Sequence, residues 1–410
     1  MRTRQPFHVM TKPIGPICNL DCEYCFYLEK EELYPETRSF RMEDSVLENY
    51  VRQYIETQPT NEVVFAFQGG EPTLMGIPFF ERTMEFQRKY RRRGMTIQNT
   101  LQTNGTLIDD DWAKFFKKNN FLLGISLDGT PELHDKYRFD KQRRPSHHNV
   151  VRGIRYLQKH QVEFNILCVV NEHNAQKPLE VYNYVKSLGV EFMQFIPIVE
   201  HFGDGEAVSP RSVGARQYGD FLVAIFDEWV QKDIGKVFIQ IFDIALEAWL
   251  GYNPSLCIFN QTCGNALALE HNGDLYSCDH YVSPEYLVGN VMEQTMREMT
   301  ESDFQIKFGR DKQDTLPQYC LDCEVKFMCN GGCPKNRFIK TPAGEDGLNY
   351  LCQGYRHFFN HIDKPMKLMA TALERSQPAA SIMPLMQKAQ TTKNRIPRAN
   401  QPKRKRRRKK

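Results

Sequence analysis

The hydrophobic pattern divides the chain into two parts. Up to about residue 200, short apolar runs rich in Val, Ile and Phe alternate with longer stretches in which apolar residues recur at helical spacing. Runs of this length predict buried strands, and the stretches between them predict amphipathic helices. The strands are expected at residues 6–12, 62–68, 96–102, 121–127, 162–170 and 191–199. The helices are expected at residues 43–57, 78–92, 109–119, 146–160 and 176–187.

The alternation predicts the fold class. Strands and helices that alternate are typical of parallel βα units. Six units predict an α/β fold, an open and partial (β/α)6 TIM-like barrel, whose functional groups collect where the strands end. After about residue 205 the alternation stops, and two helices are expected at 211–232 and 238–250. We predict a barrel domain over residues 1–240, a small cysteine-rich domain over 241–365 and a flexible basic tail over 366–410.

Composition and charge narrow the function classes. The net charge of +4 depends on the last eight residues, Lys403 to Lys410, which are all Lys or Arg, so that the rest of the chain is mildly acidic. We therefore expect no nucleic-acid partner for the body of the chain. The basic tail is expected to be a solvated, disordered end, and a weak anchor on nucleic acid or another acidic surface is the alternative. No run approaches the ~18 apolar residues of a membrane span, and no apolar signal segment follows Met1, which predicts a cytoplasmic protein with no membrane partner. Twelve cysteines in such a chain indicate metal binding or catalysis rather than disulfides.

Three cysteines follow the first expected strand. Cys18, Cys22 and Cys25 are spaced CxxxCxxC. A zinc ion and a [4Fe–4S] cluster both take four protein ligands at a closed site. Three cysteines with no fourth nearby predict a cluster with one open iron, to which a substrate or cofactor can bind. Half of a zinc site, completed from elsewhere in the chain, is the alternative.

Other polar motifs follow the next strands. Gly70 lies in Gln-Gly-Gly-Glu-Pro after the second strand, where glycine lets the backbone approach a ligand closely and Glu71 supplies an acceptor. Ser126 ends the fourth strand, and Arg138 follows it with a guanidinium suited to a carboxylate. The alternatives are ordinary turns and a solvated surface arginine. Cys168 lies inside an apolar strand, and we expect it in the core.

Eight more cysteines come between residues 257 and 352. Two groups of four suit two fully ligated iron–sulfur clusters or two structural zinc ions, and the CxxC spacing occurs in both. The eight residues are Cys257, Cys263, Cys278, Cys320, Cys323, Cys329, Cys333 and Cys352.

The two cysteine patterns resemble known families. CxxxCxxC with Tyr24 before the last cysteine resembles the signature of radical S-adenosylmethionine (SAM) enzymes, in which the open iron binds SAM. There an electron from the cluster cleaves SAM to a 5′-deoxyadenosyl radical, which abstracts a hydrogen atom from the substrate. C-x9-G-x4-C from Cys263, followed by C-x2-C-x5-C-x3-C from Cys320, resembles the SPASM domain of such enzymes. The SAM contacts implied by the resemblance are Tyr24, Gly70, Ser126, Arg138 and Val199.

The SPASM resemblance implies two auxiliary [4Fe–4S] clusters, which makes three clusters in all. The implied ligands of the first are Cys257, Cys263, Cys278 and Cys333. The implied ligands of the second are Cys320, Cys323, Cys329 and Cys352. Folding of this part is then expected to depend on metal.

Three stretches, 64–74, 164–170 and 276–281, are similar to anaerobic sulfatase-maturating enzymes within this group. This similarity implies that a cysteine or serine in a Cys/Ser-x-Pro-x-Arg segment of a target sulfatase is oxidised to Cα-formylglycine without oxygen, through loss of a Cβ hydrogen. It implies reduced flavodoxin or ferredoxin as the electron donor. It also implies that Asp279, directly after Cys278, is the general base. The alternative for Asp279 is a loop cap that accepts backbone N–H groups.

Two other functions remain open. Another SPASM maturase, which forms thioethers or crosslinks on a ribosomal peptide, often carries a precursor-binding domain at its N-terminus. Only about seventeen residues precede Cys18, too few for such a domain. A zinc-ribbon protein that binds nucleic acid through its basic tail is the other alternative, but it leaves the barrel pattern unexplained.

Overall fold

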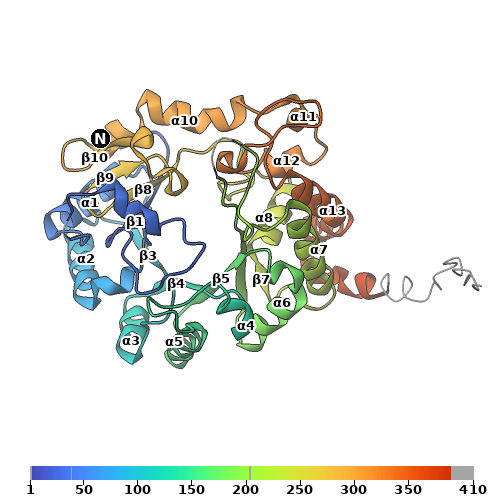
Figure 1. Cartoon of the computed structure of the whole chain (residues 1–410), viewed down its shortest axis with the longest axis horizontal. Coiled ribbons are helices and arrows are strands. Elements are labelled where there is room, and N and C mark those ends of the chain that lie inside the picture. The colour runs from blue at the N-terminus through green and yellow to red at the C-terminus, as the bar shows by residue number, and fades with distance from the viewer. Residues whose placement is uncertain (1, 38, 203–204, 389–410) are drawn as a thin grey trace, which may run out of the picture.

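The computed structural model describes residues 2–37, 39–202 and 205–388. Ten strands form one open sheet in the order β10-β9-β8-β1-β2-β3-β4-β5-β6-β7. Figure 1 shows helices around the outside of the curved sheet, with α10, α11 and α12 extending from the side of β8–β10 toward α7 and α13. The strands are β1 His8–Lys12, β2 Glu62–Phe67, β3 Thr96–Thr103, β4 Phe121–Ser126, β5 Phe164–Val170, β6 Phe192–Pro197, β7 Phe238–Ile239, β8 Ala266–Glu270, β9 Asp274–Tyr276 and β10 Leu287–Asn290.

Strands β1 to β6 pair in parallel with their neighbours in chain order. This arrangement confirms the predicted partial barrel, and all six expected strands form. The helices between them are α1 Asp44–Thr57, α2 Ile77–Tyr90, α3 Asp110–Lys118, α4 Pro131–His134, α5 His147–Lys159 and α6 Pro178–Ser187. The short 3-10 helices of the chain are η1 Leu28–Leu33, η2 Pro72–Met75, η3 Asn174–Gln176, η4 Asp279–Tyr281, η5 Pro284–Tyr286, η6 Pro334–Asn336 and η7 Ala379–Ile382.

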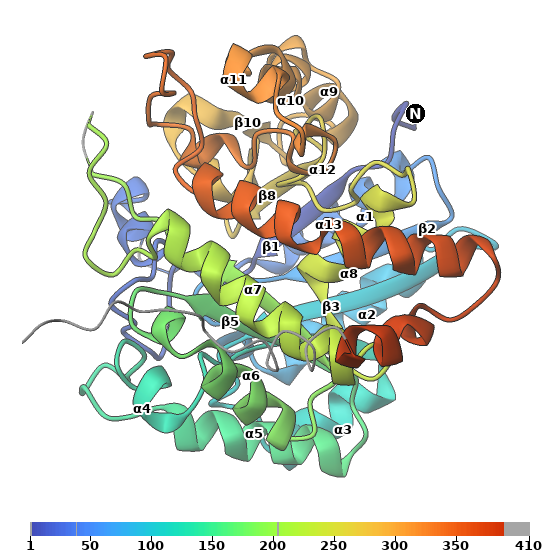
Figure 2. The same ribbon diagram turned by 90° about the vertical axis from the view of Figure 1, so that its right-hand side faces the viewer.

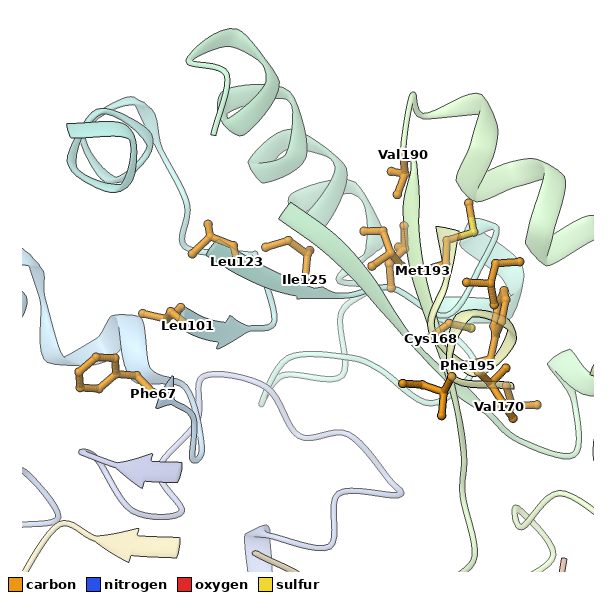
Figure 3. Close-up of a cluster of buried hydrophobic side chains, with 14 of the residues drawn as sticks. Phe67, Leu101, Leu123, Ile125, Cys168, Val170, Val190, Met193 and Phe195 are labelled. Carbon is orange, nitrogen blue, oxygen red and sulfur yellow. The ribbon is translucent and has the colours of Figure 1, made fainter. Parts of the chain in front are cut away.

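Apolar side chains of adjacent strands meet in rows between the sheet and the helices. Phe67 pairs with Leu101, and Leu101 pairs with Leu123, so that the three side chains follow one another across β2, β3 and β4 (Figure 3). Cys168 of β5 belongs to the same core and is fully buried, as its apolar surroundings predict. Because successive strand residues point to opposite faces, the residues between these core positions face the inside of the barrel.

The second part of the chain joins the same sheet. The first two of its helices, α7 Ala215–Lys232 and α8 Gln240–Trp249, lie where they are expected. Strand β8 then pairs in parallel along the whole of β1, and β9 and β10 continue the sheet in antiparallel pairs. The expected boundary at residues 240/241 therefore falls at the start of α8, and both parts contribute to one sheet. The remaining helices are α9 Met296–Thr300, α10 Asp303–Asp314, α11 Gln318–Leu321, α12 Lys326–Cys329 and α13 Cys352–Glu374.

The predicted start of the flexible tail, at residue 366, is too early in the chain. Residues 366–374 continue α13, which lies beside α7 and contacts η7 (Figure 2). Met366 and Met369 are fully buried in this contact. Pro365 lies inside the helix, where proline normally ends one, but the apolar packing on both sides of it maintains the helix. Residues 389–410, including the basic run, lie outside the described residues. Among the described helices, none combines the length and the apolar character needed to cross a membrane.

Candidate functional site

The three-cysteine loop lies at the carboxyl end of β1, where the barrel pattern predicts functional groups. Its start is tied to the loop after β2, because the Gly70 N–H donates to the Gly15 carbonyl over 2.7 Å. Its middle is tied to the segment after α4, because the Asp21 N–H donates to the Phe139 carbonyl over 2.8 Å and the Glu23 N–H donates to the Tyr137 carbonyl over 3.0 Å. Backbone hydrogen bonds from two sides therefore fix the loop.

The three thiols lie close to one another. Burial, the carboxylate of Glu71 and the thiols of Cys22 and Cys25 together raise the pKa of the Cys18 thiol to about 12. Burial also raises the pKa of the Cys22 thiol to about 12, against the lowering by nearby Arg138. Asn104 donates from Nδ2 to Cys18 Sγ over 3.6 Å. Thiols whose pKa is raised this far, as in Cys18 and Cys22, become thiolates only if a strong positive charge, such as iron, binds them.

The donor set fits an iron–sulfur cluster better than a zinc ion. Among the described residues, no three His, Cys, Asp or Glu side chains converge as ligands of a single metal ion. The ligands of a cubane bind separate corners and therefore stand farther apart than the ligands of one ion. All other cysteines lie elsewhere, with Cys168 in the core and eight in the second part of the chain. A three-thiolate cluster with one open iron is consistent with this arrangement.

Gly70 is required by a close approach of two backbones. A Cβ atom at this position would lie 1.9 Å from the Ile17 carbonyl oxygen, inside the cysteine loop. The neighbouring Glu71 is fully buried, and its carboxylate accepts hydrogen bonds from the Thr103 Oγ1 and the Asn104 N–H over 2.7 and 2.8 Å. We expected Glu71 to be an acceptor for a ligand. In the structure it instead joins the loop after β2 to the end of β3.

Tyr24 and Arg138 meet at a buried carboxylate that the sequence analysis did not single out, Asp128. Arg138 Nε lies 2.8 Å from Asp128 Oδ2, and the Tyr24 hydroxyl donates to the same oxygen. The guanidinium also lies over the Tyr24 ring, 5.3 Å from its centroid. The alternative of a solvated surface arginine is wrong, because the Arg138 side chain is only 9% exposed. The signal for Asp128 is an Asp-Gly pair directly after an expected strand.

The five expected SAM contacts are distributed around the mouth of the barrel. Ser126 is buried at the end of β4, two residues before Asp128. Gly70 borders the cysteine loop from the side of β2. Val199 is buried just after β6, two strands along the sheet from β4.

The first group of four cysteines comes together from distant segments. Cys263, Cys278 and Cys333 are partly buried and Cys257 is more exposed, and desolvation acts to raise the pKa of each of the four thiols. Cys333 raises the pKa of the other three thiols further, so it lies beside all of them. The structure thus brings together the same four residues that the SPASM resemblance groups.

The second group lines one pocket, which contains Cys320, Cys323, Cys329 and Cys352. Burial raises the pKa of the Cys329 thiol to about 12, and Cys352, Cys320 and Cys323 act in the same direction. Four thiols around one pocket suit a fully ligated cluster.

Asp279 lies between the barrel and the first four-cysteine group. It begins η4 directly after Cys278, and its Oδ1 lies 2.5 Å from Nζ of Lys12, the last residue of β1. Burial acts to raise the pKa of Asp279, but Lys12, His280 and Lys335 together lower it more, so that the pKa lies below its ordinary value. The Asp279 side chain keeps 16% exposure, against 3% for Lys12. A carboxylate that is ionised and partly accessible can accept a proton.

The surroundings of Lys12 connect Asp279 to the three-cysteine loop. The Lys12 ammonium lies 4.5 Å from the ring centroid of Tyr27, two residues after Cys25. The Tyr27 hydroxyl donates to the buried carboxylate of Glu270, which pairs with Lys12 across β1 and β8. Lys12 is thus a site residue that the sequence analysis did not identify, since a lysine at the end of a strand has no pattern of its own.

The fold and these sites define an iron–sulfur barrel enzyme with one open three-cysteine site and two four-cysteine sites. Comparison with protein families matches residues 13–193 to the radical SAM superfamily and residues 257–324 to an iron–sulfur cluster-binding domain, SPASM. A serine-type anaerobic sulfatase-maturating enzyme of Bacteroides thetaiotaomicron is 46% identical over 92% of this chain and 95% of its own length. A cysteine-type enzyme of Clostridium perfringens is 37% identical over 87% of this chain and 96% of its own length.

A solved structure agrees with these relatives. The native enzyme anSMEcpe, with bound AdoMet (SAM) and the Cp18Cys peptide, is similar to this chain with a TM-score of 0.81 and 36% identity, over 90% of this chain and 99% of that one. The chain belongs to the anaerobic sulfatase-maturating enzymes, which are radical SAM oxidoreductases.

Proposed function

We propose that this chain oxidises a serine or cysteine in a Ser/Cys-x-Pro-x-Arg segment of a sulfatase to Cα-formylglycine without oxygen. The observation that carries the proposal is the position of Asp279. It follows a ligand of the first four-cysteine group and forms an ion pair with the last residue of the strand that leads to Cys18. This position supports a role for Asp279 as the proton acceptor, between the proposed radical-generating site and the proposed electron acceptor.

The proposed roles divide as follows. When bound, SAM and the cluster on Cys18, Cys22 and Cys25 supply the radical that removes a Cβ hydrogen from the substrate. Tyr24 and Arg138, fixed by Asp128, shape the SAM site together with Ser126, Gly70 and Val199. Asp279 accepts the hydroxyl or thiol proton while one electron leaves the substrate, which completes a two-electron oxidation to the aldehyde or thioaldehyde.

Serine is the side chain that we propose as the preferred substrate, because the relative with 46% identity is named as serine-type. We propose reduced flavodoxin or ferredoxin as the electron donor, on family grounds. We also propose that the reaction takes place in the cytoplasm, because the eleven cysteines assigned to clusters have to stay reduced.

The test is anaerobic incubation of the reconstituted protein with SAM, a reductant and matched peptides that carry Ser, Cys or Ala before x-Pro-x-Arg. Mass spectrometry is expected to show loss of two hydrogens from the Ser peptide, and the same loss with exchange of sulfur for oxygen from the Cys peptide. The Ala peptide is the control and stays unchanged. About twelve irons per chain are expected for three cubanes. Formation of 5′-deoxyadenosine with unmodified Ser and Cys peptides would reject the substrate, and zinc in place of iron would reject the chemistry.

A further inference from the structure

Two cations lie between the four-cysteine groups, Lys312, which is buried, and Arg337, which is partly buried. Lys312 of α10 is only 1% exposed, and its ammonium donates to the carbonyls of Cys257 and Asn260 over 2.6 and 2.5 Å. Cys257 belongs to the first four-cysteine group. The ammonium therefore holds the backbone that carries one of the proposed ligands.

Arg337 continues this contact toward the second group. Its guanidinium donates to the Lys312 carbonyl over 2.6 Å and to the carbonyls of Asn330 and Gly331 over 2.9 and 3.0 Å. These two carbonyls lie in the turn between Cys329, of the second group, and Cys333, of the first. One side chain therefore fixes a turn that both groups share.

The close approach of Arg337 constrains the turn itself. Gly331 has a positive φ of 74°, and a Cβ at this position would lie 2.7 Å from Nη2 of Arg337. A residue other than glycine would therefore push the guanidinium away from the carbonyls. Arg337 therefore contacts both the turn and the backbone of Lys312, and a change in one of the three is expected to displace the others.

Neither cation has a carboxylate partner among the described residues; both donate only to backbone carbonyls. The charged or ionisable groups near Lys312 are the thiols of Cys263, Cys257 and Cys333 and the guanidinium of Arg337. The groups that raise the pKa of Arg337 are also cysteine thiols, and they come from both four-cysteine groups.

A buried charge is costly unless an opposite charge compensates it. A cluster on four thiolates carries net negative charge and gains more when it is reduced, and its potential depends on nearby charge and hydrogen bonds.

We propose that Lys312 and Arg337 are the fixed counter-charges of the two auxiliary clusters, and that Lys312 makes the cluster of the first group easier to reduce. This inference rests on the proposed function, in which that cluster receives the electron that the substrate loses. Both are positioning residues, because they act through the clusters and do not touch the substrate.

The test compares reduction potentials in the reconstituted holoenzyme. Lys312→Gln keeps a donor for the carbonyls and removes the charge. Lys307→Gln, on the same helix but with a side chain that is 74% exposed, is the matched control. Potentials are measured by redox titration with electron paramagnetic resonance, and the cluster of the three-cysteine site is recognised by its change when SAM is added.

Lys312→Gln is expected to shift the potential of one auxiliary cluster downward, with the potential of the SAM-binding cluster unchanged and no shift in Lys307→Gln. An unchanged auxiliary potential in a fully loaded Lys312→Gln protein would overturn the inference. If Lys312→Gln binds only about eight irons per chain, the potential cannot be compared and Lys312→Arg is tested instead. An iron content of about twelve in Lys312→Arg supports a requirement for positive charge. An iron content that stays at about eight assigns Lys312 a purely structural role. Wild-type protein without iron would instead reject the proposed function, so the two failures are distinguishable.

Discussion

Lys12 Nζ and Asp279 Oδ1 lie 2.5 Å apart, although 267 positions separate the two residues in the chain. The contact exists because β8 pairs with β1 in parallel and β9 pairs with β8 in antiparallel, so that the loop after β9 starts beside β1. The same pairing places the first four-cysteine group beside the three-cysteine loop. One strand pair thus brings together the proposed base, its cation and two proposed cluster sites.

Asp279→Asn is expected to separate SAM cleavage from product formation. Asparagine keeps the size of the side chain but cannot take a proton, and a positioned base contributes about 10²–10⁴-fold to rate. We expect 5′-deoxyadenosine at close to the wild-type rate and formylglycine reduced by about that factor, measured together by chromatography and peptide mass spectrometry. Asp274→Asn, which changes another carboxylate in the same domain, is the comparison. Formylglycine at the normal rate in Asp279→Asn would leave the residue as a loop cap.

Lys12→Met is expected to leave SAM cleavage intact and to lower the share of cleavage events that lead to formylglycine. Without the ammonium, the Asp279 carboxylate loses the contact that orients it, and a small misplacement of a reacting group can cost about 10²-fold. We expect more 5′-deoxyadenosine per formylglycine formed, with the iron content unchanged. Lys141→Met, at an exposed position, is the control and is expected to keep the wild-type ratio. Equal ratios in the two variants would contradict an orienting role for Lys12.

The barrel could be predicted because its signal is local. Each apolar run is one strand, each periodic stretch is one helix, and the six units need only short-range pattern to identify them. The extension of α13 to Glu374 was missed, because residues 366–410 show poor helical periodicity, while burial of Met366 and Met369 against distant elements maintains the helix. Long-range packing has no signature in a local window.

The same difference between local and long-range signals decides which residues of the candidate site could be predicted. The cysteines stand out by spacing, and the structure groups them as the family resemblance implies. Asp128 and Lys12 were missed, since each acquires its role from a residue far along the chain: Asp128 from Arg138 and Tyr24, and Lys12 from Asp279. A single buried charged side chain is recognisable only when its partner is known.

Gly70→Ala is expected to damage the three-cysteine site without removing the other two. The new Cβ would lie 1.9 Å from the Ile17 carbonyl oxygen, so the cysteine loop has to move. Overpacking of this kind costs about 1–3 kcal/mol or more. We expect iron to fall from about twelve to about eight per chain and SAM cleavage to be lost. Gly205→Ala adds a Cβ in open space and serves as the control. Full iron and activity in Gly70→Ala would show that the loop tolerates the shift.

His134 gives the protein a pH-dependent stability whose sign follows from its hydrogen bonds. Its Nδ1 accepts from the Asp128 N–H over 3.3 Å, and its Nε2 lies 3.0 Å from Ser146 Oγ, which itself donates to the Arg138 carbonyl. His134 Nε2 therefore donates, and the ring is neutral. Burial, helped by the charge of Arg138, lowers the pKa of His134 well below its ordinary value.

In the unfolded chain His134 takes up a proton below about pH 6.5, whereas in the folded chain it does not. The stability from the neutral ring is therefore complete above about pH 6.5 and is lost as the pH falls, by up to about 1.4 kcal/mol per pH unit. We expect His134→Gln to have a lower thermal midpoint at pH 7.5 than wild type, but a smaller decrease of the midpoint between pH 7.5 and 5.5.

His148→Gln, at an exposed position, is the control. Any stability that the protein loses because its clusters dissociate in acid is lost in this variant too. The neighbouring His147, whose pKa burial also lowers, keeps part of the dependence in His134→Gln. Parallel curves for wild type and His134→Gln would show that this ring is not the source, because removal of the titrating group must remove its share of the slope.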